Sequence, residues 1–199
     1  AAKEQGLEDK FIDFIYFLAA EGSYYITRGY TKNSIEFIRM AATTAEAQGR
    51  IKEAHYLYSN LGDYYQNFIG DFDRSIDDYL KALTMVREMG DKAREAVCLG
   101  IIGQVKCLQN NVTDSDMYIE QAYQVAKSSG DDYYLNMVLG QMSYIASYQS
   151  DWKKANTLLR ESLQLMDKLD KETTHLKRLV REQFFALLNL GQAERHLDN

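Results

Sequence analysis

The chain has 199 residues, of which 46% are hydrophobic and 26% are charged, and its formal net charge is -6. This composition is typical of a folded domain and excludes a disordered chain. An acidic chain without a basic run repels phosphate backbones, so no nucleic-acid partner is expected. The chain contains no proline, which favours long helices without interruption.

Hydrophobic spacing predicts helices and no strand, because apolar residues recur at every third or fourth position. In chain order, the expected helices cover about residues 5–28, 32–48, 50–69, 72–88, 91–109, 113–129, 131–149, 152–169 and 172–197. The most apolar stretch covers residues 11–20. It is shorter than the roughly 20 residues that cross a bilayer, so no membrane span is expected.

Two sets of positions repeat along the chain with one period. Small residues occupy positions 34, 75, 115 and 155, at spacings of 41, 40 and 40 residues. Turn positions 49, 90, 130 and 170 show the same three spacings. In pairs such as Gly70-Asp71, glycine ends one helix and aspartate caps the next. The prediction is one domain, 1–199, with helix-pair repeats at about 5–48, 50–89, 91–129 and 131–169 and an extra helix at 172–197.

The first helix of each pair carries a Leu-Gly-x-x-Tyr pattern, complete at Leu61-Gly62 with Tyr65. Partial copies occur at Ile102-Gly103, at Leu190-Gly191, and at Gly22 with Tyr25 and Gly29. The second helix carries a small-large-small set, as at Ser75, Tyr79 and Ala82.

These residues resemble the tetratricopeptide repeat family over essentially the whole chain. The common repeat has about 34 residues, so the longer period here is similar to the long-helix variant of the family. HEAT and armadillo repeats also have periods near 40 and remain the alternative. The resemblance implies an all-α fold, a right-handed α-solenoid of antiparallel helix pairs.

The resemblance also implies a ligand groove lined by the first helix of each pair. The positions carried over from the family are Ser23, Thr27, Tyr56, Ser59, Asp63, Asn67, Gln104, Tyr144, Tyr148 and Gln192. The Lys/Arg/Asn clamp with which chaperone-binding members hold a C-terminal carboxylate is missing, so a chaperone tail is not expected. Tyrosine anchors and amide hydrogen bonds favour a peptide or protein segment. The alternative is that this face is a solvated inner wall.

Tyrosine is the enriched residue, with 15 copies, and pairs occur at 24–25, 64–65 and 133–134. Adjacent residues of an α-helix point about 100° apart. We therefore expect one tyrosine of each pair to fill a packing position and the other to face the groove or solvent.

No residue pattern indicates catalysis or metal binding. His55, His175 and His196 lack zinc-site spacing. The acids at 71, 73, 77 and 78 lack the glycine and glutamate of a calcium loop. We expect these acids to cap a helix or to face solvent. No enzyme activity, no metal and no cofactor is expected.

The glycines at 62, 100, 103 and 140 fall inside predicted helices without a phosphate-loop motif. We expect each of them to permit close helix packing. Cys98 and Cys107 are nine residues apart, about 13 Å along a helix axis, which is too far for a disulfide. We expect buried thiols and a reducing, cytoplasmic location.

Both terminal helices carry more apolar residues than one packing stripe requires, and exposed apolar surface usually marks an interface. The predicted interface residues are Phe11, Phe14, Ile15, Phe184, Phe185 and Leu188. A second copy of the chain would cover them in a homodimer. Since the first residue is not methionine, the chain is expected to be a fragment, and a flanking domain or missing repeat is the other candidate.

The expected function is non-catalytic: a protein-protein interaction or scaffold module that binds a peptide or protein segment in its concave groove. The alternative is a sensor segment of a bacterial signalling or transcription-regulatory protein, in which a bound peptide or metabolite controls an attached domain.

Overall fold

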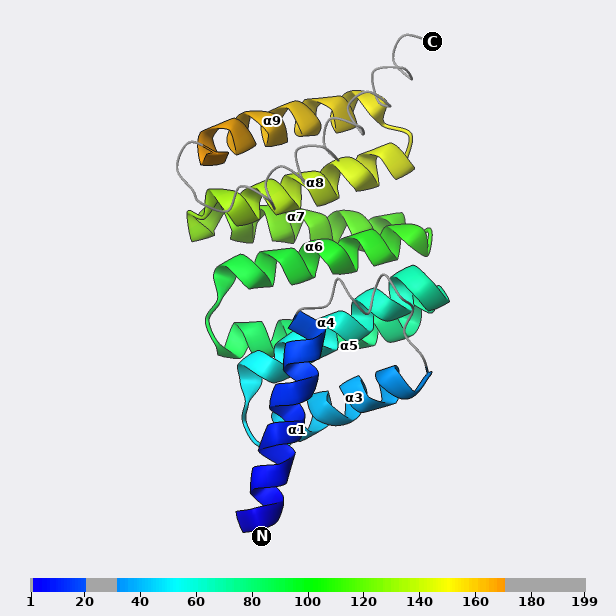
Figure 1. Cartoon of the computed structure of the whole chain (residues 1–199). Helices are drawn as coiled ribbons and strands as arrows, with labels where there is room; N and C mark the ends of the chain where they lie inside the picture. Colours follow the sequence, from blue (N-terminus) through cyan, green and yellow to red (C-terminus); the bar gives the residue numbers. More distant parts are fainter. Residues whose placement is uncertain (1, 21–31, 171–199) are drawn as a thin grey trace. The chain divides into compact units, whose positions relative to one another are not determined.

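The computed structural model describes residues 2–20 and 32–170, and every regular element within these ranges is a helix (Figure 1). The predicted all-α class is confirmed. The chain divides into two compact units, Ala1–Asp91 and Lys92–Asn199. The division falls at the turn between the second and third predicted repeats. None of the helices in the described ranges is long and apolar enough to cross a membrane.

The first unit is built around its helix α4. Its elements are α1 (Ala2–Ala20), α3 (Lys32–Ala47), α4 (Ile51–Tyr64), the π-helix η1 (Tyr65–Ile69) and α5 (Phe72–Glu88). Helix α4 packs against α1, α3 and α5. The largest fully buried side chains include Leu57, Tyr58, Leu61 and Tyr79, so the core lies around α4.

In the second unit, α6 and α8 are the inner pair. Its elements are α6 (Lys92–Leu108), α7 (Val112–Ser129), α8 (Asp132–Tyr148) and α9 (Trp152–Asp170). Helix α6 packs against α7 and α8, and α8 also packs against α7 and α9. Leu99, Ile102, Val138, Leu139 and Leu159 are buried between these helices.

The helix boundaries follow the sequence prediction closely. The segment predicted at 72–88 is α5, Phe72–Glu88, and the segment predicted at 152–169 is α9, Trp152–Asp170. Helix α1 begins three residues before its predicted start at residue 5. The predicted helix at 172–197 lies outside the described residues.

The turns have the backbone conformation that the glycine pattern predicts. Gly49, Gly70, Gly90 and Gly130 have φ between 67° and 72°, and Asn110 and Ser150 take the equivalent left-handed position. The next residue then caps the following helix. For example, the Asp71 carboxylate accepts a hydrogen bond from the backbone N–H of Arg74 at 3.1 Å. Local chemistry therefore sets these helix ends.

One interval between these turns is longer than the others, and it contains η1. Left-handed residues stand at 49, 70, 90, 110, 130 and 150, so the interval from 49 to 70 holds 21 residues and each of the others holds 20. A π-turn closes an i→i+5 bond and holds one residue more than an α-turn. Residues 50–69, predicted as one α-helix, therefore change to π-helix at Tyr65 because the extra residue must be accommodated.

Deleting Asn67 from η1 is expected to change the free energy of unfolding by less than about 1 kcal/mol. The deletion restores the 20-residue interval, and the residues from 67 to 69 are exposed, so little packing is lost. Urea unfolding followed by circular dichroism measures the effect.

The matched control deletes Gln104 from α6, which has no extra residue. This deletion turns the buried Val105 and Cys107 by about 100° out of the core. We expect a loss of about 3 kcal/mol or more. Equal losses in the two deletion variants would contradict the assignment of η1 as an inserted residue.

The glycines inside helices divide into two groups. A Cβ at Gly62 would lie 2.5 Å from the Tyr79 ring, and one at Gly103 would lie 3.2 Å from backbone atoms of α7. A Cβ at Gly100 would lie 1.7 Å from the Gln141 side chain. These three glycines permit close packing as predicted. A Cβ added at Gly140 would meet no described atom within 4 Å. The helix predicted at 172–197 lies outside the described residues, so close packing at Gly140 stays a prediction.

Candidate functional site

The described groove positions of the first unit lie on one face of α4 and η1, and three of them, Tyr56, Ser59 and Asp63, form hydrogen bonds within the protein. The Tyr56 hydroxyl donates to the Ala19 carbonyl at 3.1 Å, and its ring packs edge-on against Tyr16 at 5.2 Å. The Ser59 hydroxyl donates to the His55 carbonyl at 2.9 Å. Tyr56 therefore stabilises the contact between α1 and α4.

Asp63 lies one turn after Ser59 on the same face. Its carboxylate accepts a hydrogen bond from the Tyr79 hydroxyl of α5 at 2.5 Å. Burial raises the pKa of Asp63, and the hydrogen bond from Tyr79 lowers it in part. Asn67 follows one turn later, on η1, and is exposed. This face thus presents the Ser59 hydroxyl, the Asp63 carboxyl and the Asn67 amide at successive helical turns.

Asp63→Asn is expected to stabilise the protein at neutral pH. Because the folded protein raises the pKa of Asp63, the folded state binds more protons than the unfolded state. Stability is then lost as pH rises above the unfolded value of about 3.9. Asparagine keeps a carbonyl acceptor for Tyr79 and does not ionise.

Thermal unfolding of both proteins between pH 3 and pH 8 measures this effect. The gain should grow with pH and vanish at the acid end of the range, where Asp63 is protonated in both states. A variant that is less stable than the wild type at pH 7 would contradict the assigned direction.

The groove positions of the second unit are more open. Tyr144 and Tyr148 of α8 are 41% and 47% exposed. They are four residues apart, so they share one helix face. Gln104 of α6, the neighbouring helix, is half-buried. Partial burial raises the pKa of Tyr144, and Cys107 of α6 and Tyr148 add to the shift.

Gly140 belongs to the same face of α8, one turn before Tyr144. No described atom lies within 4 Å of the position of a Cβ there, so no described side chain covers this point of the half-buried glycine. The sequence analysis assigned Gly140 to packing because a glycine inside a helix does not indicate what approaches it. Among the described residues, the structure places two exposed tyrosines beside a glycine that no described side chain covers.

A second apolar surface lies between α1 and α3. Phe14 and Phe17 are both 59% exposed, and Phe37 is 49% exposed. Phe14, Ile15, Leu18, Ala19, Ser34, Phe37 and Ile38 line a cavity of about 150 Å³ at this place. We call this surface the α1–α3 groove.

The predicted interface residues of α1 have different positions relative to this groove. Phe14 is exposed, as predicted. Phe11 is half-buried and packs edge-on against Phe37 at 6.5 Å, and Ile15 is buried and lines the floor. The remaining predicted interface and groove residues lie outside the described ranges; these are Ser23, Thr27, Phe184, Phe185, Leu188 and Gln192.

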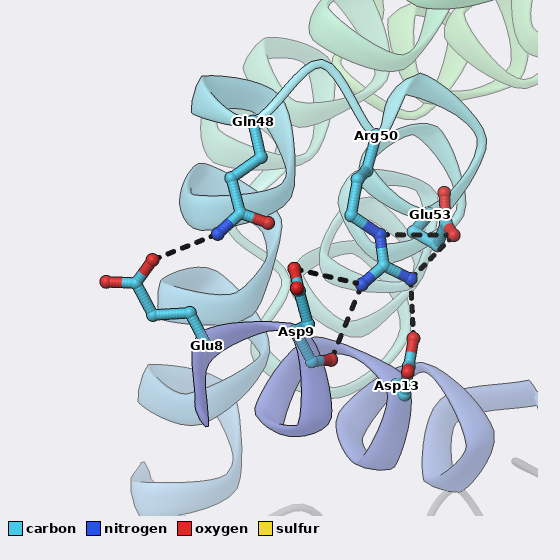
Figure 2. Close-up of polar contacts among 6 residues, drawn as sticks. All are labelled: Glu8, Asp9, Asp13, Gln48, Arg50 and Glu53. Atoms are coloured by element: carbon cyan, nitrogen blue, oxygen red, sulfur yellow. Dashed lines mark hydrogen bonds and ion pairs between the residues drawn. The ribbon is translucent and has the colours of Figure 1, made fainter. Parts of the chain in front are cut away.

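Arg50 holds α1 in place at the turn between α3 and α4 (Figure 2). Its guanidinium donates to the Asp13 carboxylate at 2.5 Å and to Glu53 at 2.7 Å. A further bond of 3.0 Å joins Gln48 to Glu8. The hydrogen bond to Asp13 is the largest cause that raises the pKa of Arg50. This network fixes the helix that carries the exposed phenylalanines.

The sequence analysis missed a buried ion pair between α3 and α5. Arg39 donates two parallel hydrogen bonds to Asp78, at 2.7 Å and 2.6 Å. The Asp78 side chain is only 3% exposed, so the prediction that it faces solvent is wrong. The hydrogen bond to Asp78 raises the pKa of Arg39. A partner 39 residues away in the chain leaves no local signal.

The tyrosine-pair prediction is also wrong at positions 64 and 65. Both Tyr64 and Tyr65 are buried, and their rings meet edge-on at 5.7 Å. The Tyr65 ring lies under the guanidinium groups of Arg39 and Arg74, at 5.7 Å and 5.5 Å. Tyr65 begins η1, where the rotation per residue is smaller than in an α-helix, so both rings find packing partners.

Within residues 2–20 and 32–170, no three His, Cys, Asp or Glu side chains are arranged so that they could hold a metal ion. Cys98 and Cys107 are buried and form no disulfide. Burial raises the pKa of Cys107, which disfavours the reactive thiolate.

No family model matches the sequence. No curated protein matches it either. Among solved structures, the chain is similar to the crystal structure of BtubC (BKLC) from P. vanneervenii. The TM-score is 0.52 and the sequence identity is 14%, over 100% of this chain and 89% of that chain. At this identity, the likeness concerns the fold.

Proposed function

We propose that the chain is a non-catalytic protein-interaction module, built of tetratricopeptide-like helix pairs, that binds a peptide or protein segment. The observation that carries the proposal is the pair of exposed tyrosines on α8, Tyr144 and Tyr148. Both stand at positions that the family resemblance assigns to the ligand groove. A cytoplasmic location, which agrees with two cysteines that form no disulfide, belongs to the same proposal.

The physical argument is that this face of α8 lowers the stability of the folded chain when no partner covers it. Exposed tyrosine rings leave apolar area in water, and a glycine inside a helix costs about 1 kcal/mol relative to alanine. Gly140 packs against no described atom, so close packing within the described protein does not offset its cost. An apolar side chain of a partner would fit the open position beside Tyr144, and the tyrosine hydroxyls would hydrogen-bond its backbone.

Selection of a displayed random-peptide library on the purified chain tests the proposal. We expect an enriched consensus sequence, and we expect Tyr144→Ala/Tyr148→Ala to weaken binding of the selected peptides at least about tenfold. Truncating an aromatic hot spot typically costs about 2 kcal/mol or more. Fluorescence anisotropy with labelled peptides measures the affinities.

Met117→Ala is the matched control, because Met117 is also exposed, at 46%, but lies on α7. It should leave binding unchanged. Phe14→Ser tests the α1–α3 groove separately. If Phe14→Ser abolishes binding and the tyrosine variant does not, the assignment to α8 is wrong. If no peptide sequence is enriched, the interaction-module proposal itself is wrong.

A further inference from the structure

Asp63 differs from the buried acids of the described protein in having no cation beside it. Asp78 is paired with Arg39, and the buried Glu95 is paired with Lys92 at 2.7 Å. Within residues 2–20 and 32–170, the Asp63 carboxyl group is partly removed from water and accepts one hydrogen bond, from Tyr79. A carboxylate removed from water without a positive partner is unfavourable.

The surroundings of Asp63 hold its carboxylate in a position to accept further hydrogen bonds. The Tyr79 ring is 1% exposed and fits closely against Gly62, so its hydroxyl is held in position at one carboxylate oxygen. Asp63 itself is half-buried rather than enclosed, so part of the residue is in contact with solvent where no described residue covers it. The site is therefore preorganised and partly open to solvent within the described ranges.

Two more acceptors flank the carboxylate at helical spacing. Ser59 precedes Asp63 by four residues and Asn67 follows it by four, and such residues are neighbours on one helix face. The Ser59 hydroxyl donates its hydrogen bond to the His55 carbonyl, so its oxygen can still accept one. Asn67 is exposed and offers an amide oxygen. A group with several N–H donors and a positive charge matches this set.

We propose that this face of α4 binds a cationic side chain, arginine or lysine, of the partner segment, with Asp63 as its counter-ion. The inference rests on the proposed interaction function and specifies the chemistry of its ligand. Arginine fits best, because its planar group donates several hydrogen bonds in fixed directions.

The test is an NMR titration with N-acetyl-arginine amide as the probe and N-acetyl-norleucine amide as the neutral control. The carboxyl carbon of Asp63 reports its pKa. A cation that binds the ionised form lowers this pKa, by linkage, and we expect the arginine probe to lower it by at least about 0.5 unit at saturation. The norleucine probe should leave the pKa of Asp63 unchanged. Asp77, which is exposed on α5, should not respond.

Asp63→Asn should abolish the chemical-shift changes that the arginine probe causes at Ser59 and Asn67. An unchanged pKa of Asp63, or equal responses at Asp63 and Asp77, would overturn the proposal. These results would leave the interaction module intact if library selection still yields peptides that depend on Tyr144 and Tyr148. Failure of that selection, with a positive arginine titration, would instead remove the module and keep the cation site.

Discussion

Gly62→Ala is expected to lower the free energy of unfolding by about 2 kcal/mol, because overpacking a rigid core typically costs about 1–3 kcal/mol. The added Cβ would lie 2.5 Å from the Tyr79 ring. This ring is 1% exposed and its hydroxyl is bonded to Asp63, so it has no space into which it can move. The better helix propensity of alanine offsets only part of the loss.

Gly140→Ala is the matched substitution, with the same chemistry in a helix of the second unit. It is expected to raise the free energy of unfolding by about 1 kcal/mol, because alanine favours the helix and no described atom lies near the new methyl group. Urea unfolding of both variants measures the two effects. Destabilisation by Gly140→Ala, or none by Gly62→Ala, would contradict the packing described for these two positions.

The second large effect is expected for Arg39→Met, at about 3 kcal/mol of lost stability, because removing one partner of a buried ion pair leaves the other charge uncompensated. Such a loss typically costs about 3–5 kcal/mol. The lower end applies because the Arg39 side chain is 35% exposed, whereas that of Asp78 is 3% exposed. Water can therefore approach Asp78 where the guanidinium stood. Chemical denaturation gives the value.

Two further variants separate the ion pair from other contacts. Arg74→Met removes the second guanidinium on the Tyr65 ring, but Arg74 is 66% exposed, so a change below about 1 kcal/mol is expected. Arg39→Met/Asp78→Leu removes both charges and should recover most of the stability lost by Arg39→Met. A double variant as unstable as Arg39→Met would show that the loss arises from packing rather than from the unpaired carboxylate.

Gly62 and Gly140 show how far sequence reasoning extends at the candidate site. Both are glycines inside helices, and the sequence predicts close packing at both. Within the described ranges only Gly62 is covered, because α5 places Tyr79 over Gly62 while no described side chain reaches Gly140. The family resemblance predicts the tyrosines beside Gly140 as groove residues. The open position next to them required the arrangement of neighbouring helices.

Tyr56 and Asp63 illustrate the same limit in the first unit. The family resemblance assigns both to the groove on equal grounds. In the structure, Tyr56 bonds to the Ala19 carbonyl of α1, whereas Asp63 bonds to Tyr79 of α5 and has no cation beside it within the described residues. Their partners lie 37 and 16 residues away in the chain. Neither distance corresponds to a helical period, so no sequence pattern indicated these contacts.

The all-α class, the helix boundaries and the turns can be read from the sequence, because these features depend on residues that are neighbours in the chain. Left-handed glycines end helices, side chains such as Asp71 cap the next helix, and apolar spacing defines each packed face. The 21-residue interval before Gly70 already contained the signal of η1. Tertiary contacts determined which glycine is covered, which acid is paired and which tyrosine is exposed. Those properties depend on side chains brought together from distant parts of the chain.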